Sequence, residues 1–264
     1  MLALLLAAAV SCGRVALTPF DFARAPLSAG RRADTVVLRG RPQLVHLYGD
    51  KGGAPVIVSS GDGGWIHLAP QVAERLAAQG FFVVGFDVKA YLESFTTDSH
   101  TLGVADVPGD YRALVDYASR GSPARPVLVG VSEGAGLSVL AAADPAVQRH
   151  VAGVVGLGLP DRNELGWRWK DSLIYVTHGV PNEPTFNASD LVGRLTPIPL
   201  AVIHSTRDEY VPESDVEKLM ARANEPKRLW TVNASDHRFT GNVAEFDRRL
   251  LESIDWVRQN QPQI

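Results

Sequence analysis

Cysteine is almost absent from this chain, in which Cys12 is the single one among 264 residues. One cysteine cannot form an internal disulfide framework and cannot supply a thiolate-rich metal site, so both are excluded. Basic residues are not in excess either, since 26 Lys and Arg stand against 29 Asp and Glu. Because the sequence has no Lys/Arg-rich run, we expect no nucleic-acid partner.

Signatures of several other chemistries are also missing. The sequence contains no HExxH and no GxxxxGK[ST] motif. The glycines around Gly61 do not have the spacing of a dinucleotide-binding GxGxxG motif. Asp98 and His100 are two potential metal ligands without a third, and such pairs are usually polar loop residues. We therefore predict neither a metal ion nor a cofactor.

The N-terminus has a short apolar run at residues 2–10, which is too short to span a bilayer. Small residues around Cys12 follow it, and this order is typical of a secretory signal. It also resembles a bacterial lipoprotein signal in which Cys12 is lipidated, although no Lys or Arg precedes the run. We predict a signal peptide over 1–12, a linker over 13–34, and a protein that is periplasmic or lipid-anchored at the cell envelope of a bacterium. The alternatives are an ordinary cleaved signal and a frayed apolar terminus.

The remainder, residues 35–264, alternates between apolar or β-branched runs and segments of helical period. The runs are 35–40, 44–49, 55–60, 81–87, 126–131, 151–158, 199–205 and 228–232, and the helical segments are 68–79, 106–120, 133–144, 213–223 and 243–259. The first two runs are close enough to form an antiparallel hairpin, whereas helical crossovers make the later strands parallel. This pattern predicts an α/β fold with an eight-stranded, mostly parallel sheet and helices on both faces, as in the α/β-hydrolase fold.

One connection, residues 160–197 between the sixth and seventh predicted strands, is unusually long. Long connections in compact domains are often functional lids, and the apolar residues Trp167 and Trp169 argue against disorder. We predict a cap over the active site, in which these two tryptophans are candidate substrate contacts. Trp65, which lies outside this segment, is a third candidate. The alternative is that the segment only adds packing to the edge of the sheet.

The strongest local signal is GVSEG at residues 130–134, a GxSxG motif that directly follows an apolar strand and begins an Ala/Leu/Gly-rich helix. A serine hydroxyl is a weak nucleophile unless it is presented free of neighbours and beside a base. A strained strand-to-helix turn presents it in this way, and the flanking glycines leave room for the crowded backbone. We therefore predict that Ser132 is a nucleophile.

An oxyanion hole would need two backbone donors near Ser132. The N–H of Glu133 lies at the start of a helix and is the expected first donor. The second is expected from Asp62 or Gly63, in the SGDGGW loop at residues 60–65 after the third predicted strand. Alternatively, these glycines form only a tight turn or a nest for phosphate.

A base and an acid should follow in the order Ser, Asp, His. Asp208 follows the seventh predicted strand and His237 follows the eighth, where an imidazole can reach the serine at the carboxyl edge of the sheet. The other histidines lie elsewhere, and the competing acids are Glu209 and Asp236. We predict a triad of Ser132, His237 and Asp208, with acyl transfer as the reaction.

The pieces SGDGGW, VVGFDVKAYL, GVSEGAG, STRDEYVP and DHRFTGN occur in this order, and the chain from about residue 54 onward resembles the bacterial virulence-protein VirJ/AcvB family of α/β-hydrolases. The resemblance assigns the same triad roles to Ser132, Asp208 and His237. It implies an exported enzyme that cleaves the aminoacyl ester of an aminoacylated phospholipid such as lysyl-phosphatidylglycerol. Glu133 departs from the pattern, because an aromatic residue is expected there.

Two other functions stay open at this point. One is a small-ester esterase or dienelactone-hydrolase-like enzyme. The other is a non-catalytic binding protein of a secretion or virulence assembly, built on a hydrolase scaffold. An ester, as a phospholipid or otherwise, is the expected ligand, and association with a membrane surface is a further expectation.

Overall fold

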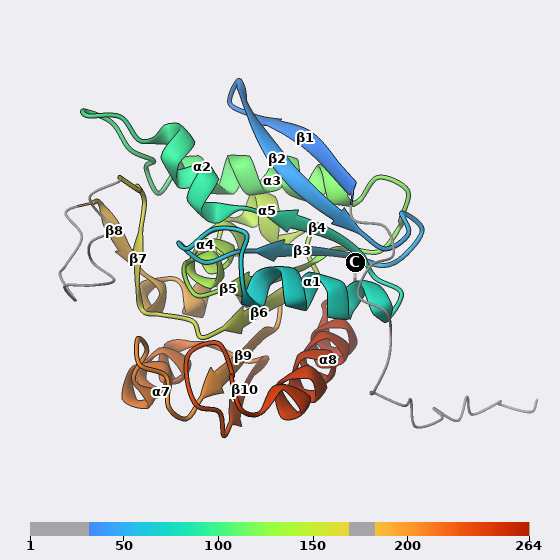
Figure 1. Ribbon diagram of the computed structural model, residues 1–264, viewed down its shortest axis with the longest axis vertical. Helices are drawn as coiled ribbons and strands as arrows, with labels where there is room; N and C mark the ends of the chain where they lie inside the picture. Colours follow the sequence, from blue (N-terminus) through green and yellow to red (C-terminus); the bar gives the residue numbers. More distant parts are fainter. Residues whose placement is uncertain (1–31, 169–182, 264) are drawn as a thin grey trace, which may run out of the picture.

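The computed structural model describes residues 32–168 and 183–263. Eight strands form a sheet in the order β1-β2-β4-β3-β5-β6-β9-β10 (Figure 1). They are β1 (Arg32–Leu38), β2 (Arg41–Tyr48), β3 (Pro55–Ser59), β4 (Phe82–Phe86), β5 (Val127–Val131), β6 (Gly153–Leu157), β9 (Leu200–Ser205) and β10 (Lys227–Val232). Strand β2 pairs antiparallel with β1 and β4, and the other neighbours pair parallel. The predicted eight-stranded, mostly parallel sheet is confirmed.

The central strands are short apolar runs because both faces of the sheet are covered. Every residue of β3, β4, β5, β6 and β9 is buried, which is typical of parallel sheets between two helical layers. Strand β1, at one edge, has four exposed residues in succession at its start. It begins at Arg32, so residues 32–34 belong to the sheet and not to the predicted linker. The reason is that their backbone pairs with the end of β2.

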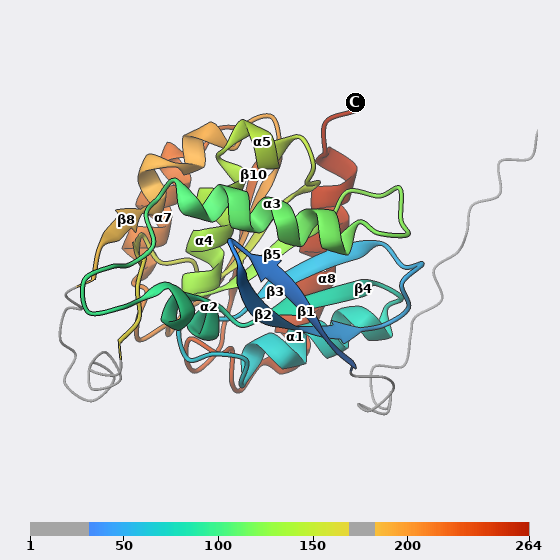
Figure 2. The ribbon, with the colours of Figure 1, turned by 90° about the horizontal axis from the view of Figure 1, so that it is seen from above.

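Helices cover the sheet on both faces (Figure 2). Helices α1 (Leu68–Ala78) and α8 (Val243–Asn260) pack on one face. The other face carries α2 (Val88–Phe95), α3 (Asp106–Ala118), α4 (Glu133–Ala142), α5 (Pro145–Gln148) and α7 (Glu213–Arg222). Helix α4 is buried at every residue, so the helix that follows Ser132 passes through the core. Among the described ranges, none of these helices has the length and apolarity needed to cross a bilayer.

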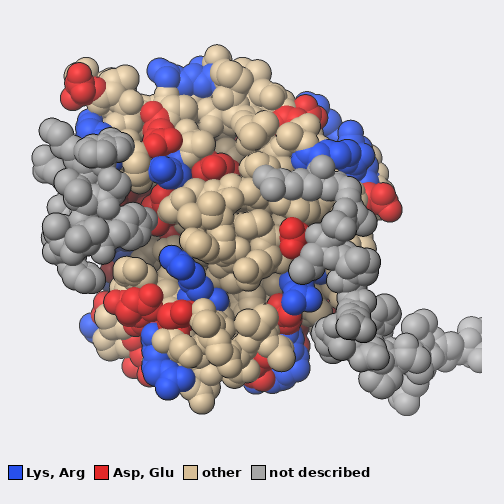
Figure 3. Space-filling view, in the orientation of Figure 1, with Lys and Arg blue, Asp and Glu red and all other residues tan. Residues whose placement is uncertain are grey.

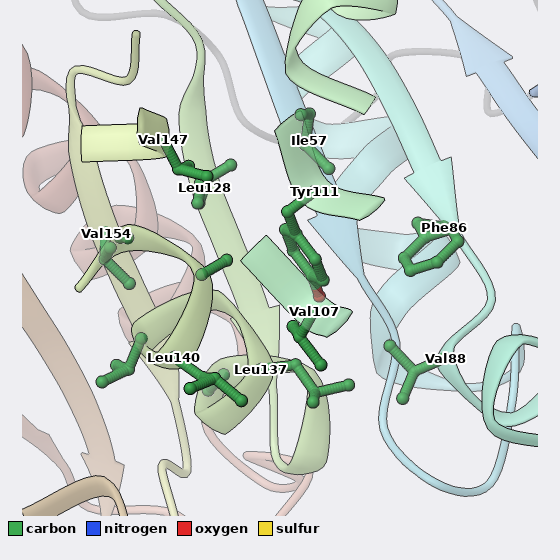
Figure 4. Packing of buried hydrophobic residues seen from close by; sticks show 14 of the residues in the cluster. Ile57, Phe86, Val88, Val107, Tyr111, Leu128, Leu137, Leu140, Val147 and Val154 are labelled. Carbon is green, nitrogen blue, oxygen red and sulfur yellow. The ribbon is translucent and has the colours of Figure 1, made fainter. Parts of the chain in front are cut away.

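The larger core lies between the sheet and helices α3 and α4 (Figure 4). Ile57 and Leu128 of the sheet face Tyr111 and Leu137 of these helices in a cluster without solvent access. Burying a side chain of this size contributes about 1.5–3 kcal/mol. The hydroxyl of Tyr111 donates to Ser59 Oγ at 2.9 Å, so its polar end is also satisfied.

The segment predicted as a cap is partly regular in the structure. Strands β7 (Arg162–Glu164) and β8 (Thr185–Asn187) form a two-stranded antiparallel sheet, and two 3₁₀ turns, η2 (Ala188–Asp190) and η3 (Val192–Arg194), follow it. Three-residue strands are too short to show a period, which is why the sequence did not reveal them. Residues 169–182, with Trp169, and the predicted signal peptide lie outside the described residues.

On one face of the molecule, the acidic and basic side chains are intermixed (Figure 3). On the face drawn in Figure 3, Lys and Arg alternate with Asp and Glu around a central area with few charges. This agrees with the formal net charge of −3.

Candidate active site

Ser132 lies in a sharp turn between β5 and α4. Its backbone has φ 50° and ψ −120°, an uncommon and strained conformation for a residue with a side chain. The flanking glycines make the turn feasible. A Cβ on Gly130 would lie 2.3 Å from the backbone of Ala135, and one on Gly134 would lie 2.3 Å from the Ser60 carbonyl oxygen. The strand-to-helix turn expected from the GxSxG motif is therefore present.

Asp208 and His237 meet at the same edge of the sheet, from the loops that follow β9 and β10. His237 Nδ1 lies 2.6 Å from Asp208 Oδ2. The other oxygen, Oδ1, accepts hydrogen bonds from the N–H groups of Tyr210 at 3.0 Å and Val211 at 2.9 Å. Burial opposes ionisation of Asp208, but the hydrogen bond with His237 and these two N–H groups outweigh it and lower the pKa of the carboxyl.

The two competing acids have other roles in the structure. Glu209 accepts a hydrogen bond from the backbone N–H of His237 at 2.8 Å, so it holds the loop and not the ring. Asp236 accepts from the backbone N–H groups of Arg238 at 3.0 Å and Thr240 at 2.9 Å, and thus closes a local turn. Of these three acids, Asp208 is the one bonded to the imidazole.

The imidazole of His237 faces the same pocket as Ser132. Its Nε2 atom is buried and makes no hydrogen bond to any described residue, Ser132 included. Gly158, just after β6, makes space for the ring, because a Cβ there would lie 2.5 Å from His237 Cε1. The structure thus brings a serine, an imidazole and a carboxylate to one place, with one ring nitrogen unbonded.

A pocket of about 390 Å³ opens above Ser132. Its lining comes from the loop and helix start at 61–69, the elbow at 131–133, the beginning of the cap segment, and the loops after β9 and β10. Openings of this volume suit small organic groups.

The predicted oxyanion residues line this pocket. The N–H of Gly64 donates to the Gly61 carbonyl at 3.0 Å and forms a turn with Asp62 and Gly63 at its centre. This turn lies against the elbow, since a Cβ on Gly61 would lie 3.4 Å from Ser132 Cβ. Glu133 is the first residue of α4, so its N–H has no partner within the helix. Asp62, Gly63 and Glu133 are therefore close to Ser132 from two sides.

The prediction that Trp65 contacts substrate was wrong. Its ring is buried away from the pocket, stacks on His46 at 4.9 Å and donates from Nε1 to the Tyr48 hydroxyl at 3.2 Å. Gly85 on β4 makes room for it, because a Cβ there would lie 2.2 Å from the indole. Ile66, the next residue, lines the pocket instead.

Trp167 also packs within the fold and does not line the described pocket. Its side chain is buried, and Lys89 Nζ lies 4.3 Å from the ring centroid. The backbone N–H of Trp167 donates to Thr96 Oγ1 at 3.1 Å. In the described part of the chain, the contacts of Trp167 are therefore packing contacts. Trp169 lies outside the described residues.

Among the pocket residues that were not predicted are Ile66, Arg162, Tyr210 and Arg238. All are exposed and lie in loops or a very short strand, so no periodic pattern marks them. Tyr210 and Arg238 could have been found from their position, since each is close to a predicted triad residue in the sequence. Among residues 32–168 and 183–263, no group of three His, Cys, Asp or Glu side chains is arranged to hold a metal ion.

Comparison with known proteins gives a family and a fold. The family model described as "Bacterial virulence protein (VirJ)" matches residues 54–257. The protein YfhR of Salmonella typhimurium is 29% identical over 181 residues, which cover 63% of this chain and 59% of that protein. YfhR of Escherichia coli K12 is 26% identical over 194 residues, which cover 70% of this chain and 63% of that protein. The chain thus spans less than two thirds of the length of these relatives.

Solved structures with the same fold are α/β-hydrolases and esterases. The α/β hydrolase GrgF from a Penicillium species superimposes with a TM-score of 0.66 at 13% identity, over 88% of this chain and 99% of that one. The Pyrococcus furiosus esterase Pf2001 has a TM-score of 0.65 at 19% identity, over 87% of this chain and 91% of that one. Est1E from Butyrivibrio proteoclasticus has a TM-score of 0.62 at 16% identity, over 85% of this chain and 98% of that one. At these identities the likeness establishes the fold, which is the α/β-hydrolase fold predicted from the sequence.

Proposed function

Because the chain belongs to the VirJ family of bacterial virulence proteins, we propose that it is a serine hydrolase that cleaves a carboxylic ester with Ser132, His237 and Asp208. One observation carries the proposal. His237 Nδ1 is bonded to Asp208 at 2.6 Å, while its Nε2 is unbonded in the pocket that also holds Ser132. A ring held in this way has its Nδ1 proton fixed by the carboxylate and its Nε2 lone pair available as a base.

The chemistry follows from these positions. His237 Nε2 takes the proton of Ser132 Oγ as that oxygen attacks the ester carbonyl carbon. The negative charge that develops on the carbonyl oxygen is stabilised by the N–H of Glu133 and by that of Asp62 or Gly63, and one such donor accounts for about 10²–10³ in rate. His237 then protonates the leaving alcohol, the C–O bond breaks, and an acyl-serine remains. Water, deprotonated by His237, hydrolyses the acyl-serine and restores the enzyme.

For the substrate, we propose the aminoacyl ester of an anionic phospholipid, such as lysyl-phosphatidylglycerol. The mouth of the pocket supports this choice. Two guanidinium groups, of Arg162 and Arg238, lie there beside two exposed apolar side chains, Ile66 at 52% and Tyr210 at 53% exposure. A phosphodiester suits arginine, and the apolar rim suits acyl chains at a membrane surface. Export to the cell envelope, proposed from the N-terminal sequence, would place the enzyme beside such a lipid.

A labelling experiment tests the reaction. A fluorophosphonate probe loses fluoride to an activated serine oxygen and remains bound through phosphorus. We expect wild type to be labelled and Ser132→Ala to be unlabelled, with Ser138→Ala, a buried serine on the same helix, as the matched control that keeps labelling. Absence of labelling in wild type would contradict the proposal and favour a binding protein on a hydrolase scaffold.

A second experiment tests the substrate. Hydrolysis of lysyl-phosphatidylglycerol in phosphatidylglycerol vesicles is compared with that of a short nitrophenyl ester. We expect kcat/KM to be higher for the lipid. A clear preference for the short ester would instead favour a small-ester esterase or a dienelactone-hydrolase-like enzyme.

A further inference from the structure

The side chain of Glu133 has no role in the mechanism above, which uses only its backbone N–H. The carboxyl is nevertheless buried, with the residue 7% exposed, directly after Ser132. Its Oε1 accepts a hydrogen bond from the backbone N–H of Glu164, the last residue of β7. A buried acid beside a nucleophile is costly unless it is bonded, so this contact needs an explanation.

The geometry of β7 explains why its backbone needs that acceptor. On one edge, β7 pairs with β8: the N–H of Ala188 donates to the Asp161 carbonyl at 2.7 Å, and that of Leu165 donates to the Pro184 carbonyl at 2.8 Å. In an antiparallel pair, alternate residues direct their backbone groups to opposite edges. Glu164 therefore points its N–H away from β8 and toward α4, where the Glu133 carboxyl meets it.

A second contact between β7 and α4 involves Asn163. Asn163 is fully buried, and its Nδ2 donates to the carbonyls of Pro160 at 3.1 Å and Asp161 at 3.0 Å. It lies against Gly136 of α4, where a Cβ would be 1.8 Å from Asn163 Oδ1. Strand β7 can therefore lie close to α4 for two reasons. Gly136 has no side chain to hold the strand away, and the Glu133 carboxyl bonds to the backbone of the strand.

We propose that Glu133 is a positioning residue that fixes β7 to the nucleophile elbow and thereby sets the place of Arg162 at the pocket mouth. Arg162 and Glu164 are two residues apart in a strand, so their side chains share one face and move together. Loss of the carboxyl would let the strand shift, and Arg162 with it, while Ser132 stays in its strained turn. The assignment to substrate selection rests on the proposed hydrolase function, whereas the contact itself does not.

The electrostatic surroundings fit a neutral carboxyl at this position. Burial, the charge of Glu164 on β7 and that of Asp62 in the 61–64 loop all raise the pKa of Glu133, and they outweigh the hydrogen bond from Glu164 N–H, which lowers it. On α3, burial raises the pKa of Tyr111, and a charge on Glu133 would raise it further. A neutral acid keeps negative charge away from the place where the oxyanion develops.

The first test measures the contact directly. In wild type we expect the Glu164 amide to be protected from hydrogen exchange. Glu133→Gln, which keeps a neutral carbonyl acceptor of the same length, should retain that protection. Glu133→Ala, and Glu133→Asp with its carboxyl one methylene shorter, should speed the exchange at least about tenfold, as expected for a lost hydrogen bond. Unchanged exchange in these two variants would overturn the proposal, and the wild-type and Gln measurements do not depend on whether Ala folds.

The second test separates positioning from chemistry. For Glu133→Ala we expect KM for lysyl-phosphatidylglycerol vesicles to rise about tenfold, a change equivalent to about 1.4 kcal/mol. The rate of fluorophosphonate labelling and kcat/KM for a neutral nitrophenyl ester should fall by a clearly smaller factor than kcat/KM for the vesicles, because these two reactions do not use Arg162. Glu133→Gln should behave like wild type, as should the control Glu217→Ala on the exposed side of α7.

Three outcomes of the second test would contradict the inference: an unchanged KM in Glu133→Ala, an equal loss of labelling and of both substrates, or a Gln variant that fails like Ala. Wild type that takes no label would instead refute the hydrolase function. In that case the amide-exchange result still decides whether Glu133 fixes β7.

Discussion

Substitution of Gly158 by alanine should impair catalysis more than stability. Gly158 follows β6 with φ +58°, and an added Cβ would lie 2.5 Å from Cε1 and 2.9 Å from Nδ1 of His237. Carbon atoms do not approach so closely, and the contact must open by about 1 Å to reach ordinary van der Waals separation. The other contacts of the imidazole limit how it can move, because Asp208 holds Nδ1 at 2.6 Å and the Tyr210 ring lies 5.5 Å away, centroid to centroid.

The magnitude follows from that displacement. A misplacement of about 1 Å in a reacting group costs about 10²-fold in rate, so we expect kcat of Gly158→Ala to fall about 100-fold. The left-handed backbone adds about 1–2 kcal/mol of strain in the folded state. Ester hydrolysis at saturating substrate measures the first effect, and urea unfolding measures the second.

A matched control separates the clash from the backbone strain. Gly80 also has a left-handed backbone, with φ +86°, but a Cβ there would meet nothing within 4 Å. Gly80→Ala should therefore lose a similar free energy of unfolding and keep wild-type kcat. The reasoning is refuted if Gly158→Ala has wild-type activity, or if Gly80→Ala loses as much activity as Gly158→Ala.

Three further predictions concern charged groups. Asp208→Asn should lower kcat about 10³–10⁴-fold, because Asn does not hold the His237 tautomer. The same substitution should change how the free energy of unfolding depends on pH. Since the folded-state pKa of Asp208 is lowered, its contribution is fully present above about pH 4 and disappears as pH falls through the folded pKa, so urea midpoints of wild type and Asn variant should converge there. Arg39→Ala should lower the free energy of unfolding by about 2 kcal/mol, because it leaves the buried Asp110 carboxylate without its guanidinium partner. This is less than for a fully buried pair, since the Arg39 side chain is 38% exposed. Arg162→Ala with Arg238→Ala should raise KM for lysyl-phosphatidylglycerol, whose phosphodiester the two guanidinium groups would contact, and not for a neutral ester. The double substitution should also weaken the salt dependence of that KM.

The sheet was predictable because its strands are apolar runs separated by turns or helices. The eight predicted runs coincide with the eight strands to within a few residues. Helix α2 was not predicted, because it follows β4 through Asp87, without a Gly or Pro to mark a new element. Asp87 is itself the N-cap, with its side chain accepting from Ala90 N–H at 3.1 Å, and this capping residue is the signal that could have revealed the helix.

The catalytic candidates were predictable for a different reason. Ser132 directly follows β5, and Asp208 and His237 lie in the loops after β9 and β10. Parallel strands bring their carboxyl ends to one edge whatever the distance along the chain. The tryptophans were predicted from residue type alone, without such a constraint. Trp65 ends the glycine-rich loop that lines the pocket, yet its ring packs in the core, where Gly85 leaves room for it. Which side of a loop a side chain takes depends on the neighbours that leave room for it, and a single sequence does not reveal them.

The geometry of this site depends on positions where glycine leaves room for neighbouring groups, more than on contacts between side chains. Gly130 and Gly134 permit the strained turn at Ser132, and Gly158 permits the position of His237, because in each case a Cβ would lie within 2.5 Å of another atom. Side-chain hydrogen bonds then fix the groups that occupy this space, as Asp208 fixes the imidazole of His237. Loss of a holding side chain leaves the space intact, so conservative replacements can restore function. Loss of the space cannot be compensated in the same way, since an added Cβ would meet backbone atoms at Gly130 and Gly134 and the imidazole of His237 at Gly158. Substitutions at these glycines should therefore be harder to rescue than those at Glu133 or Arg162.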